Sequence, residues 1–218
     1  MSKAISVQAL QRLPLYLQYL KTLPDTANIS ARALGAAFGF GEIQVRKDLA
    51  SVSDCGRPKL GYVVGGLRHD IACALGYDNV NDAVLVGAGR LGRALMSYKG
   101  FSDYGLNIVA AFDADAEKCG RDESGKQVFL LEKLPDLCRR MKIEIGIVTV
   151  PAPAAQSVCE LLCQSGIRAV WNFAPAHVTV PQGVLLKNEN MAASLAVLSQ
   201  HLAAEDAPAS DSEKEKTT

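Results

Sequence analysis

The fold of this chain is decided by one stretch near its middle, Ala83-Val84-Leu85-Val86-Gly87-Ala88-Gly89-Arg90-Leu91-Gly92. The run 83–86 is uniformly apolar, as a buried strand would be, and a glycine turn follows it at once and opens a helix over 91–96. Gly87 permits the tight turn, Gly89 allows the backbone to approach a pyrophosphate, and Gly92 lets the helix pack closely on the strand. This G-x-G-x-x-G pattern, in the strand and helix context that it requires, predicts a Rossmann-type domain of the α/β class.

We call residues 87–92 the glycine elbow and expect all six to bind a nucleotide whose phosphates lie at the positive end of the helix: Gly87, Ala88, Gly89, Arg90, Leu91 and Gly92. Asp113, twenty-one residues beyond Gly92 and just after the apolar run 108–112, can accept hydrogen bonds from both hydroxyls of an adenosine ribose. A carboxylate there disfavours a 2′-phosphate, so the sequence predicts NADH or NAD⁺ as the ligand. CoA is the nearest alternative ligand, and a glycine turn that binds nothing is the other interpretation.

Short apolar runs alternate with helical stretches in this part of the chain, at 83–86, 108–112, 128–130, 145–150, 169–171 and 184–186. Such runs are typical of a parallel sheet that is covered on both faces. Loops at the carboxyl ends of parallel strands line the ligand crevice. We therefore expect Thr149, Val150 and Pro151 at the fourth run, and Phe173 after the fifth, to lie near the nicotinamide. Plain connecting loops are the alternative interpretation of both segments.

Residues 1–78 carry a helical pattern, with helices predicted at 7–19, 31–38 and 43–52. Pro14 is expected to bend the first helix or to mark its effective start, and Ser30 is expected to cap the second. The third helix has an apolar stripe, and off that stripe lie Gln44, Arg46, Lys47 and Asp48. An extended segment at 60–64 and a closing helix that ends near Gly76 follow. Helix, glycine turn, helix and a basic extended segment make the layout of a winged helix-turn-helix domain, with residues 55–64 as its wing.

The N-terminal domain is the basic part of the chain, because residues 1–78 hold nine Lys and Arg against six Asp and Glu. This mild excess permits a nucleic-acid partner without requiring one. If DNA is the partner, the third helix enters the major groove and the wing lies near a minor groove. The predicted DNA-binding residues are Gln44, Arg46, Lys47, Arg57, Lys59 and Ser30. A solvated helix face is the alternative interpretation of Arg46 and Lys47.

The composition is that of a globular protein, with 49% hydrophobic and 21% charged residues among 218. No apolar run is long enough to span a membrane and no leader pattern opens the chain, so we expect a cytoplasmic protein with no membrane partner. The six cysteines have no CxxC pair, and reduced thiols with no metal site fit best. We predict a winged-helix domain at 1–78, a Rossmann domain at 79–189, a C-terminal helix at 190–202 and a disordered tail at 203–218.

Catalytic signals are missing from the sequence. It has no G-x-S-x-G, H-E-x-x-H or Walker pattern, and of its three histidines only His177 is predicted in a loop that could approach the crevice. We therefore predict no catalytic residues and a dinucleotide sensor joined to a DNA-binding head. An NAD-dependent oxidoreductase or a CoA-binding protein with an accessory N-terminal domain is the alternative.

A set of motifs distributed over residues 5–202 resembles the family of redox-sensing transcriptional repressors called Rex. The motifs are Val45-Arg46-Lys47-Asp48-Leu49, Gly61-Tyr62, the glycine elbow, Ala111-Phe112-Asp113-Ala114-Asp115, Thr149-Val150-Pro151 with Ala154-Ala155-Gln156, and Asn172-Phe173-Ala174-Pro175. The resemblance implies a homodimer that binds a palindromic operator and leaves the DNA when NADH accumulates. It also implies that the C-terminal helix is exchanged between subunits.

Two positions depart from the family pattern. In the family, an acidic residue near the start of the exchanged helix pairs with an Arg of the first helix in one state and with a Tyr in the other. Here the first two positions are occupied by Asn190 and Gln18, so a neutral amide contact would replace the ion pair. Tyr98, after the first Rossmann helix, remains available and is predicted to lie in the nucleotide site.

Overall fold

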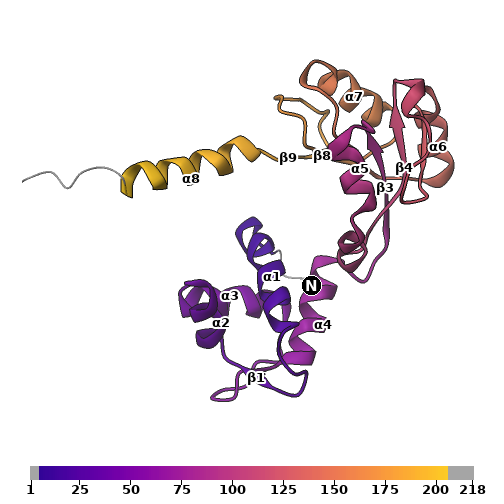
Figure 1. Cartoon of the computed structure of the whole chain (residues 1–218). Coiled ribbons are helices and arrows are strands. Elements are labelled where there is room, and N and C mark those ends of the chain that lie inside the picture. The colour runs from indigo at the N-terminus through magenta and orange to yellow at the C-terminus, as the bar shows by residue number, and fades with distance from the viewer. Residues whose placement is uncertain (1–4, 206–218) are drawn as a thin grey trace, which may run out of the picture. The chain divides into compact units, whose positions relative to one another are not determined.

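The structure is a computed structural model that describes residues 5–205, with side chains through residue 202. It divides into two compact units (Figure 1). The first runs to Asn81 and also takes in Lys99–Asn107, and the second consists of Asp82–Tyr98 and the chain from Ile108 onward. The sequence places the boundary at residue 78 and assigns 99–107 to the Rossmann domain.

Contacts within the first unit explain why Lys99–Asn107 belongs to it. The segment contains a 3₁₀ helix, Lys99–Tyr104, and the ring of Tyr104 meets that of Tyr77 edge-on at 5.2 Å between centroids. The backbone N–H of Asn81 donates to Gly105 O at 2.8 Å. The link between the first two large strands of the second unit is therefore anchored in the first unit.

Four helices and a small sheet make up the first unit. The helices are α1 (Val7–Leu20), α2 (Ala31–Phe38), α3 (Glu42–Val52) and α4 (Val64–Leu75), and the sheet pairs β1 (Asn28–Ile29) with β2 (Tyr62–Val63). The core is apolar and draws on all four helices, with Leu13, Tyr16, Leu20, Leu34, Val45, Leu49, Leu67 and Ile71 at its centre. The helix-turn-helix with a following wing is the architecture that the sequence predicts.

Pro14 does not mark the start of the first helix. α1 begins at Val7 because Ser6 caps it, its Oγ accepting from the backbone N–H of Ala9 at 3.2 Å. Pro14 lies inside this continuous helix, so the prediction that it marks the effective start is wrong.

The wing is more compact than the sequence predicts. Of the expected strand 60–64 only Tyr62–Val63 forms a strand, and its partner, Asn28–Ile29, was not predicted. Arg57 and Gly61 close a tight turn by two backbone hydrogen bonds of 2.8 and 2.9 Å. Gly61 has φ +78°, and a Cβ there would lie 2.2 Å from Ile29 O, so the turn requires glycine. Val64 already belongs to α4.

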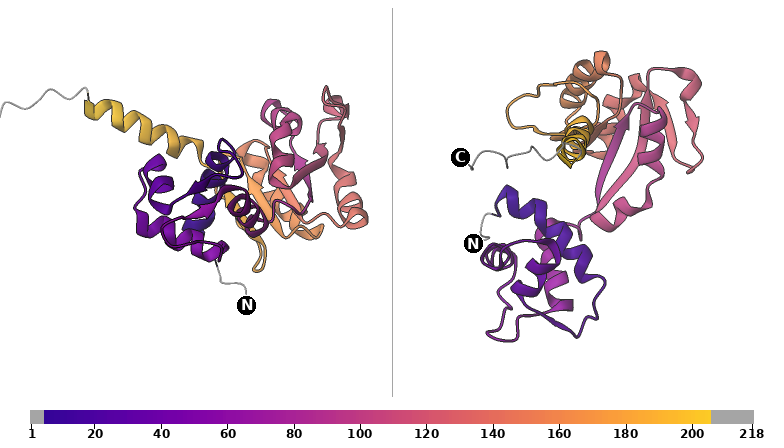
Figure 2. Two further views of the ribbon diagram at one scale, coloured as in Figure 1. Left: turned by 90° about the horizontal axis from the view of Figure 1, so that it is seen from below. Right: turned by 60° about the vertical axis from the view of Figure 1, so that its left-hand side comes forward.

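A seven-stranded sheet forms the second unit (Figure 2), in the order β5-β6-β4-β3-β7-β8-β9. The strands are β3 (Asn81–Val86), β4 (Leu106–Asp113), β5 (Gly120–Arg121), β6 (Gln127–Leu130), β7 (Ile145–Val148), β8 (Ala169–Asn172) and β9 (Leu185–Asn188). β4 pairs with β6, β3 with β7, β7 with β8 and β8 with β9 in parallel, whereas the unpredicted edge strand β5 is antiparallel to β6. Without β5 the order is that of a dinucleotide-binding Rossmann fold, which confirms the predicted class.

Helices cover the sheet. α6 (Leu134–Met141) and α7 (Ala152–Gln164) share one core with β3, β4 and β7, and its centre is formed by Val84, Phe112, Cys138, Val148, Cys159 and Leu162. α5 (Arg90–Ser97) connects β3 to β4, a step toward the β5 edge of the sheet, whereas α6 and α7 accompany steps toward the β9 edge. Because such crossovers are right-handed, α5 lies on the other face of the sheet. β3 and β7 are neighbours at the point where the strand order reverses, which is where ligands bind in such sheets.

The last helix, α8 (Met191–Glu205), extends three residues beyond its predicted end at 202. Asn190 caps it, because the Asn190 side-chain oxygen accepts from the backbone N–H of Ala193 at 3.0 Å. Its apolar side chains are exposed in this single chain: Met191, Leu195, Val197, Leu198 and Leu202. The rest of the predicted disordered tail, 206–218, lies outside the described residues.

Candidate nucleotide site and DNA interface

The glycine elbow is shaped by two close backbone approaches. Gly87 has φ +106°, and a Cβ on it would lie 2.8 Å from the carbonyl carbon of Thr149. A Cβ on Gly92 would lie 2.0 Å from Gly87 O, so the first turn of α5 packs directly on the elbow. Gly89 differs, since no protein atom lies within 4 Å of where its Cβ would be. The chain's own packing therefore does not require glycine at 89, whereas a close ligand would.

Thr149, predicted to lie near the nicotinamide, holds the elbow in place. Its backbone N–H donates to Val86 O at 2.9 Å, and its hydroxyl donates to Gly87 O at 2.7 Å. This residue follows β7, so it fastens the carboxyl ends of the two central strands together. Val150 is half-buried and Pro151 is exposed, and both continue from this point into α7.

Asp113 ends β4 beside the elbow and is 8% exposed. One carboxylate oxygen accepts from the backbone N–H of Ala88 at 2.8 Å, and the other accepts from the N–H of Asp115 at 2.9 Å. Lys118 Nζ lies 3.4 Å from Asp113, whose negative charge is the main cause of the raised pKa of Lys118. Lys118 was not predicted from the sequence, although it lies five residues after the expected ribose ligand Asp113.

Asn172 fixes the loop that carries Phe173. The buried Asn172 amide accepts from the backbone N–H of Ala174 at 3.0 Å and donates to the Asn188 side chain at 2.9 Å. The N–H of Phe173 donates to Val148 O at 2.8 Å, which brings this loop to the end of β7.

The structure thus brings most predicted nucleotide residues to one edge of the sheet, with Thr149 and Asp113 bonded to the elbow itself. Tyr98 lies elsewhere. It ends α5 at the far side from the elbow, about 12 Å away for a helix of this length.

The first unit has a basic cleft between α3 and the wing, which we call the wing cleft. It is lined by Ser30, Ala31, Arg32, Glu42, Arg46, Gly56, Arg57, Pro58, Lys59, Gly61 and Tyr62. Four of the six DNA-binding residues predicted from the sequence are among them. Four cations face one acid, and that acid, Glu42, pairs with Arg46 one helical turn away. Arg32 was not predicted, because a single cation early in α2 carries no pattern of its own.

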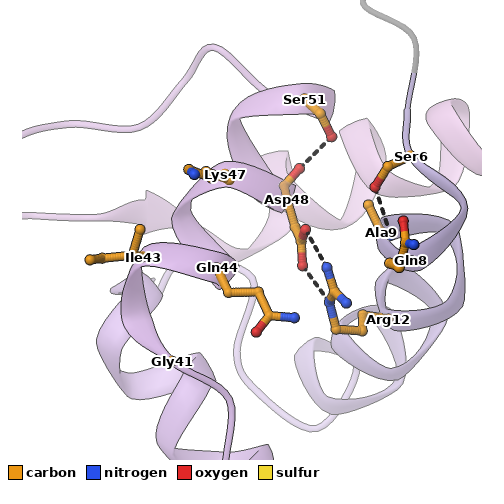
Figure 3. Close-up of a pocket in the computed structure, with 10 residues that line it drawn as sticks. All are labelled: Ser6, Gln8, Ala9, Arg12, Gly41, Ile43, Gln44, Lys47, Asp48 and Ser51. Carbon is orange, nitrogen blue, oxygen red and sulfur yellow. Dashed lines mark hydrogen bonds and ion pairs between the residues drawn. The ribbon is translucent and has the colours of Figure 1, made fainter.

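The other two predicted DNA residues, Gln44 and Lys47, line a second cleft, which lies between α1 and α3 (Figure 3). Its floor is an ion pair, in which Arg12 Nε and Nη2 donate to the two oxygens of Asp48 at 2.7 and 2.8 Å. Tyr16 OH donates to the same carboxylate at 3.0 Å. The side chains of Arg12 and Asp48 are 17% and 6% exposed, so the pair is largely withdrawn from water.

Burial, and next the neighbouring Asp48, raise the pKa of Tyr16 to about 12. The expectation that Asp48 lies with the outward polar side chains of α3 is wrong, because Arg12 and Tyr16 turn it inward. The two partners belong to α1, more than 30 residues earlier in the chain, which is why the local pattern of α3 did not show the pairing.

Neither a metal centre nor a membrane span is found in the part of the chain that the structure describes. Within it, no three His, Cys, Asp or Glu side chains gather as a metal ion would need, and no helix has the length and apolar character to cross a membrane.

Two family models match the chain. Residues 4–50 match the family described as "Putative DNA-binding protein N-terminus", and residues 78–176 match the family described as "CoA binding domain". The first match covers α1, α2 and most of α3, and the second covers the sheet as far as β8.

Whole-length relatives decide between the possible families. The redox-sensing transcriptional repressor Rex of Pelotomaculum thermopropionicum is 37% identical over 211 residues, which are 95% of this chain and 99% of that protein. The chain belongs to the Rex family. The Rex resemblance read from the motifs is thereby confirmed.

Solved Rex structures share this fold. RSP, a Rex-family repressor, has been solved in complex with NAD⁺ and operator DNA, and that structure matches with a TM-score of 0.87 and 34% identity over 93% of this chain and 94% of RSP. RSP in complex with NADH matches with a TM-score of 0.83 and 33% identity over 92% and 95% of the two chains. One Rex protein thus takes both forms of the dinucleotide and the DNA.

Proposed function

We propose that this chain is an NADH-responsive repressor that binds operator DNA as a homodimer and is released when NADH occupies the glycine elbow. The observation that carries the proposal is its whole-length similarity to RSP, whose structures hold NAD⁺ with operator DNA in one case and NADH in another. Its partner being chromosomal DNA, we place the protein in the cytoplasm.

NAD(H) is the ligand of the second unit in this proposal. The pyrophosphate lies at the open face of Gly89 and the start of α5, where backbone N–H groups and the helix dipole favour negative charge. The Asp113 carboxylate oxygens, which accept from the N–H groups of Ala88 and Asp115, each have a further lone pair that can accept from a ribose hydroxyl. It is held in place before the ligand arrives, so little ordering is lost on binding.

The nicotinamide lies against Thr149, Val150, Pro151 and Phe173. Pro151 and Phe173 are apolar, and burying the neutral ring of NADH against them costs less than burying the cationic ring of NAD⁺. This difference gives the two redox forms different affinities for a closed state. The proposal needs no turnover, and we infer that the protein is not an enzyme.

Operator DNA is the ligand of the first unit. Gln44, Arg46 and Lys47 on α3 reach bases or phosphates in the major groove. Arg57, Lys59 and Ser30, which line the wing cleft, contact the DNA backbone beside that groove. Ser30 also caps α2, its Oγ accepting from the N–H of Ala33 at 3.0 Å.

Homodimerisation through α8 supplies the second reading head. A 15-residue helix whose apolar side chains stay exposed gains little stability alone, so it needs another surface. A partner chain related by a two-fold axis provides that surface and matches the symmetry of a palindromic operator. Asn190 and Gln18 carry neutral amides, so we expect no ion pair between these positions in either state. The Asn190 side chain also caps α8, and Gln18 is exposed.

CoA is the second candidate ligand, because the family model over residues 78–176 carries that description. CoA has a 3′-phosphate on its ribose, which would meet the carboxylate of Asp113, and this repulsion favours NAD(H). Competition between CoA and NADH, followed by NADH fluorescence, separates the two.

A mobility-shift assay with a random duplex library, repeated with NADH and with NAD⁺, tests the proposed function. We expect a retained pool of palindromic duplexes that NADH releases and NAD⁺ does not. Failure to retain any duplex, or equal retention with and without NADH, would overturn the proposal.

A further inference from the structure

Arg12 and Gln44 face each other across the α1–α3 cleft (Figure 3). Arg12 cannot turn away, since Nε and Nη2 are committed to Asp48. Its Nη1 therefore points at the Gln44 amide, which is otherwise exposed at the surface of α3. Figure 3 also shows Lys47 directed to the other side of α3, away from this contact.

A guanidinium group has only donors, so the atom of Gln44 that faces it must be the amide oxygen. Turning the amide by 180° from the orientation drawn in Figure 3 places Oε1 2.8 Å from Nη1 and 3.3 Å from Nε of Arg12. Nη1, which has no part in the bonds to Asp48, then donates to that oxygen. Because the amide is planar, Nε2 then lies on the side of the amide away from Arg12, and its N–H groups are left free to donate at the exposed surface of α3.

We propose that Arg12 is a positioning residue that makes Gln44 a pure hydrogen-bond donor toward DNA, and that Gln44 therefore selects guanine in the operator. The inference rests on the proposed function, since it requires α3 to lie in the major groove. Beyond the proposed function, it states which base Gln44 recognises in the operator.

The chemistry of the base edges leads to this choice. A freely turning glutamine pairs with adenine by donating to N7 and accepting from the N6 amino group, which needs both ends of the amide. In this chain the accepting end is held by Arg12. Guanine offers two adjacent acceptors in the major groove, N7 and O6, where thymine offers only O4 beside its methyl group. Adenine and cytosine each present an amino group that would oppose Nε2.

The test begins with the duplex that the wild-type protein selects. Kd is measured for the four base pairs at every half-site position, with the wild type and with Gln44→Met, which has nearly the same shape and no amide. We expect Gln44→Met to lose discrimination between bases at one position. At that position the wild type should bind the guanine duplex with a Kd about five- to tenfold lower than that of the adenine duplex. Replacing that guanine with 7-deazaguanine, which lacks the N7 acceptor, should weaken the wild type and leave Gln44→Met unchanged.

Arg12→Lys tests the positioning role. Lysine keeps a cation beside Asp48, but one ammonium group cannot hold that carboxylate and the Gln44 oxygen as the planar guanidinium does. We expect the preference for guanine over adenine at the Gln44 position to fall to about twofold or less, while discrimination at the other positions persists. A loss of affinity for all duplexes alike is what a merely structural role would give, and it would overturn the positioning role.

If Gln44→Met loses discrimination at a position where the wild type prefers any base other than guanine, or at no position, the inference is overturned while the proposed function stands. A wild-type protein that retains no duplex would overturn both. Should Arg12→Lys fail to fold by circular dichroism, the Gln44→Met and 7-deazaguanine measurements still decide whether Gln44 acts as a donor to guanine.

Discussion

The glycine elbow of the second unit and the α3 surface of the first unit hold their functional groups in place in different ways. In the elbow the backbone itself is the proposed binding surface, and Gly87, Gly92 and Thr149 fix it through contacts that leave no room for an added Cβ. On α3 the groups that we propose read DNA are the ends of exposed side chains, and one largely buried ion pair, Arg12 with Asp48, ties the helix to α1.

The two sites are therefore damaged by different kinds of substitution. A backbone site fails when a small residue is enlarged, because the backbone carbonyl that it meets cannot move aside. A side-chain site fails when a supporting buried charge is left unpaired, whereas removal of a single exposed cation changes only the affinity of the site for DNA. The following predictions test that contrast, beginning with the largest effect.

Gly92→Ala should disrupt the elbow, because its Cβ would lie 2.0 Å from Gly87 O. We expect the second unit to lose about 3 kcal/mol of stability and NADH affinity to fall about a hundredfold, measured by thermal unfolding and NADH fluorescence. Gly89→Ala is the matched control, since its Cβ meets no protein atom within 4 Å. It should leave stability unchanged and weaken NADH alone, and equal behaviour of the two variants would refute the assignment of their roles.

Asp48→Asn should leave the largely buried Arg12 without its counter-charge. We expect the first unit to lose about 2–3 kcal/mol, less than for a fully buried pair because Arg12 keeps some contact with water. Asp25→Asn is the control, because Asp25 pairs with Arg68 at the surface and its side chain is 67% exposed. Urea unfolding should show a loss below about 0.5 kcal/mol for this control. A similar loss for both variants would mean that the Arg12–Asp48 pair contributes no more to stability than an exposed surface pair.

The same contrast explains how far the sequence could predict the molecule. The glycine elbow follows from three glycines within six residues between an apolar run and a helix, so a local pattern predicts its backbone. The two-residue strand Asn28–Ile29 has no such pattern, since so short a strand is defined by its pairing with Tyr62–Val63.

Supporting contacts between distant segments could not be predicted from local patterns. Asp48 looks like an outward polar residue of α3 until Arg12 and Tyr16 are brought beside it from α1. Thr149 was expected at the site but as a ligand contact, and its bond to Gly87 depends on the pairing of β3 with β7. Asn172 likewise gains its role only when β8 and β9 are placed side by side.

Glu42→Gln should strengthen DNA binding by a few-fold, because Glu42 is the one acid in the wing cleft and it pairs with Arg46. Lys47→Ala removes a cation and should weaken binding to all sequences alike, with a salt slope lower by about one unit. Fluorescence anisotropy at several salt concentrations measures both. An unchanged salt slope for Lys47→Ala would remove Lys47 from the phosphate contacts.

The smallest effect is expected from the thiols, which differ in their accessibility to solvent. Cys138 and Cys159 are buried in the second unit, and burial raises the pKa of each to about 11, whereas Cys55 of the first unit is exposed. At pH 8 iodoacetamide should modify Cys55 quickly and the two buried thiols only after unfolding, as mass spectrometry would show. Rapid labelling of Cys138 would contradict the packing of α6.

The central claim is that nucleotide at the elbow and DNA at the reading heads act against each other. Its most direct test is the Kd of NADH measured with and without saturating operator duplex, at one salt concentration. Because such coupling is reciprocal, NADH should bind more weakly in the presence of operator by the same factor that NADH weakens operator binding, about tenfold for 1.4 kcal/mol of coupling. Equal NADH affinities in the two titrations would contradict the claim.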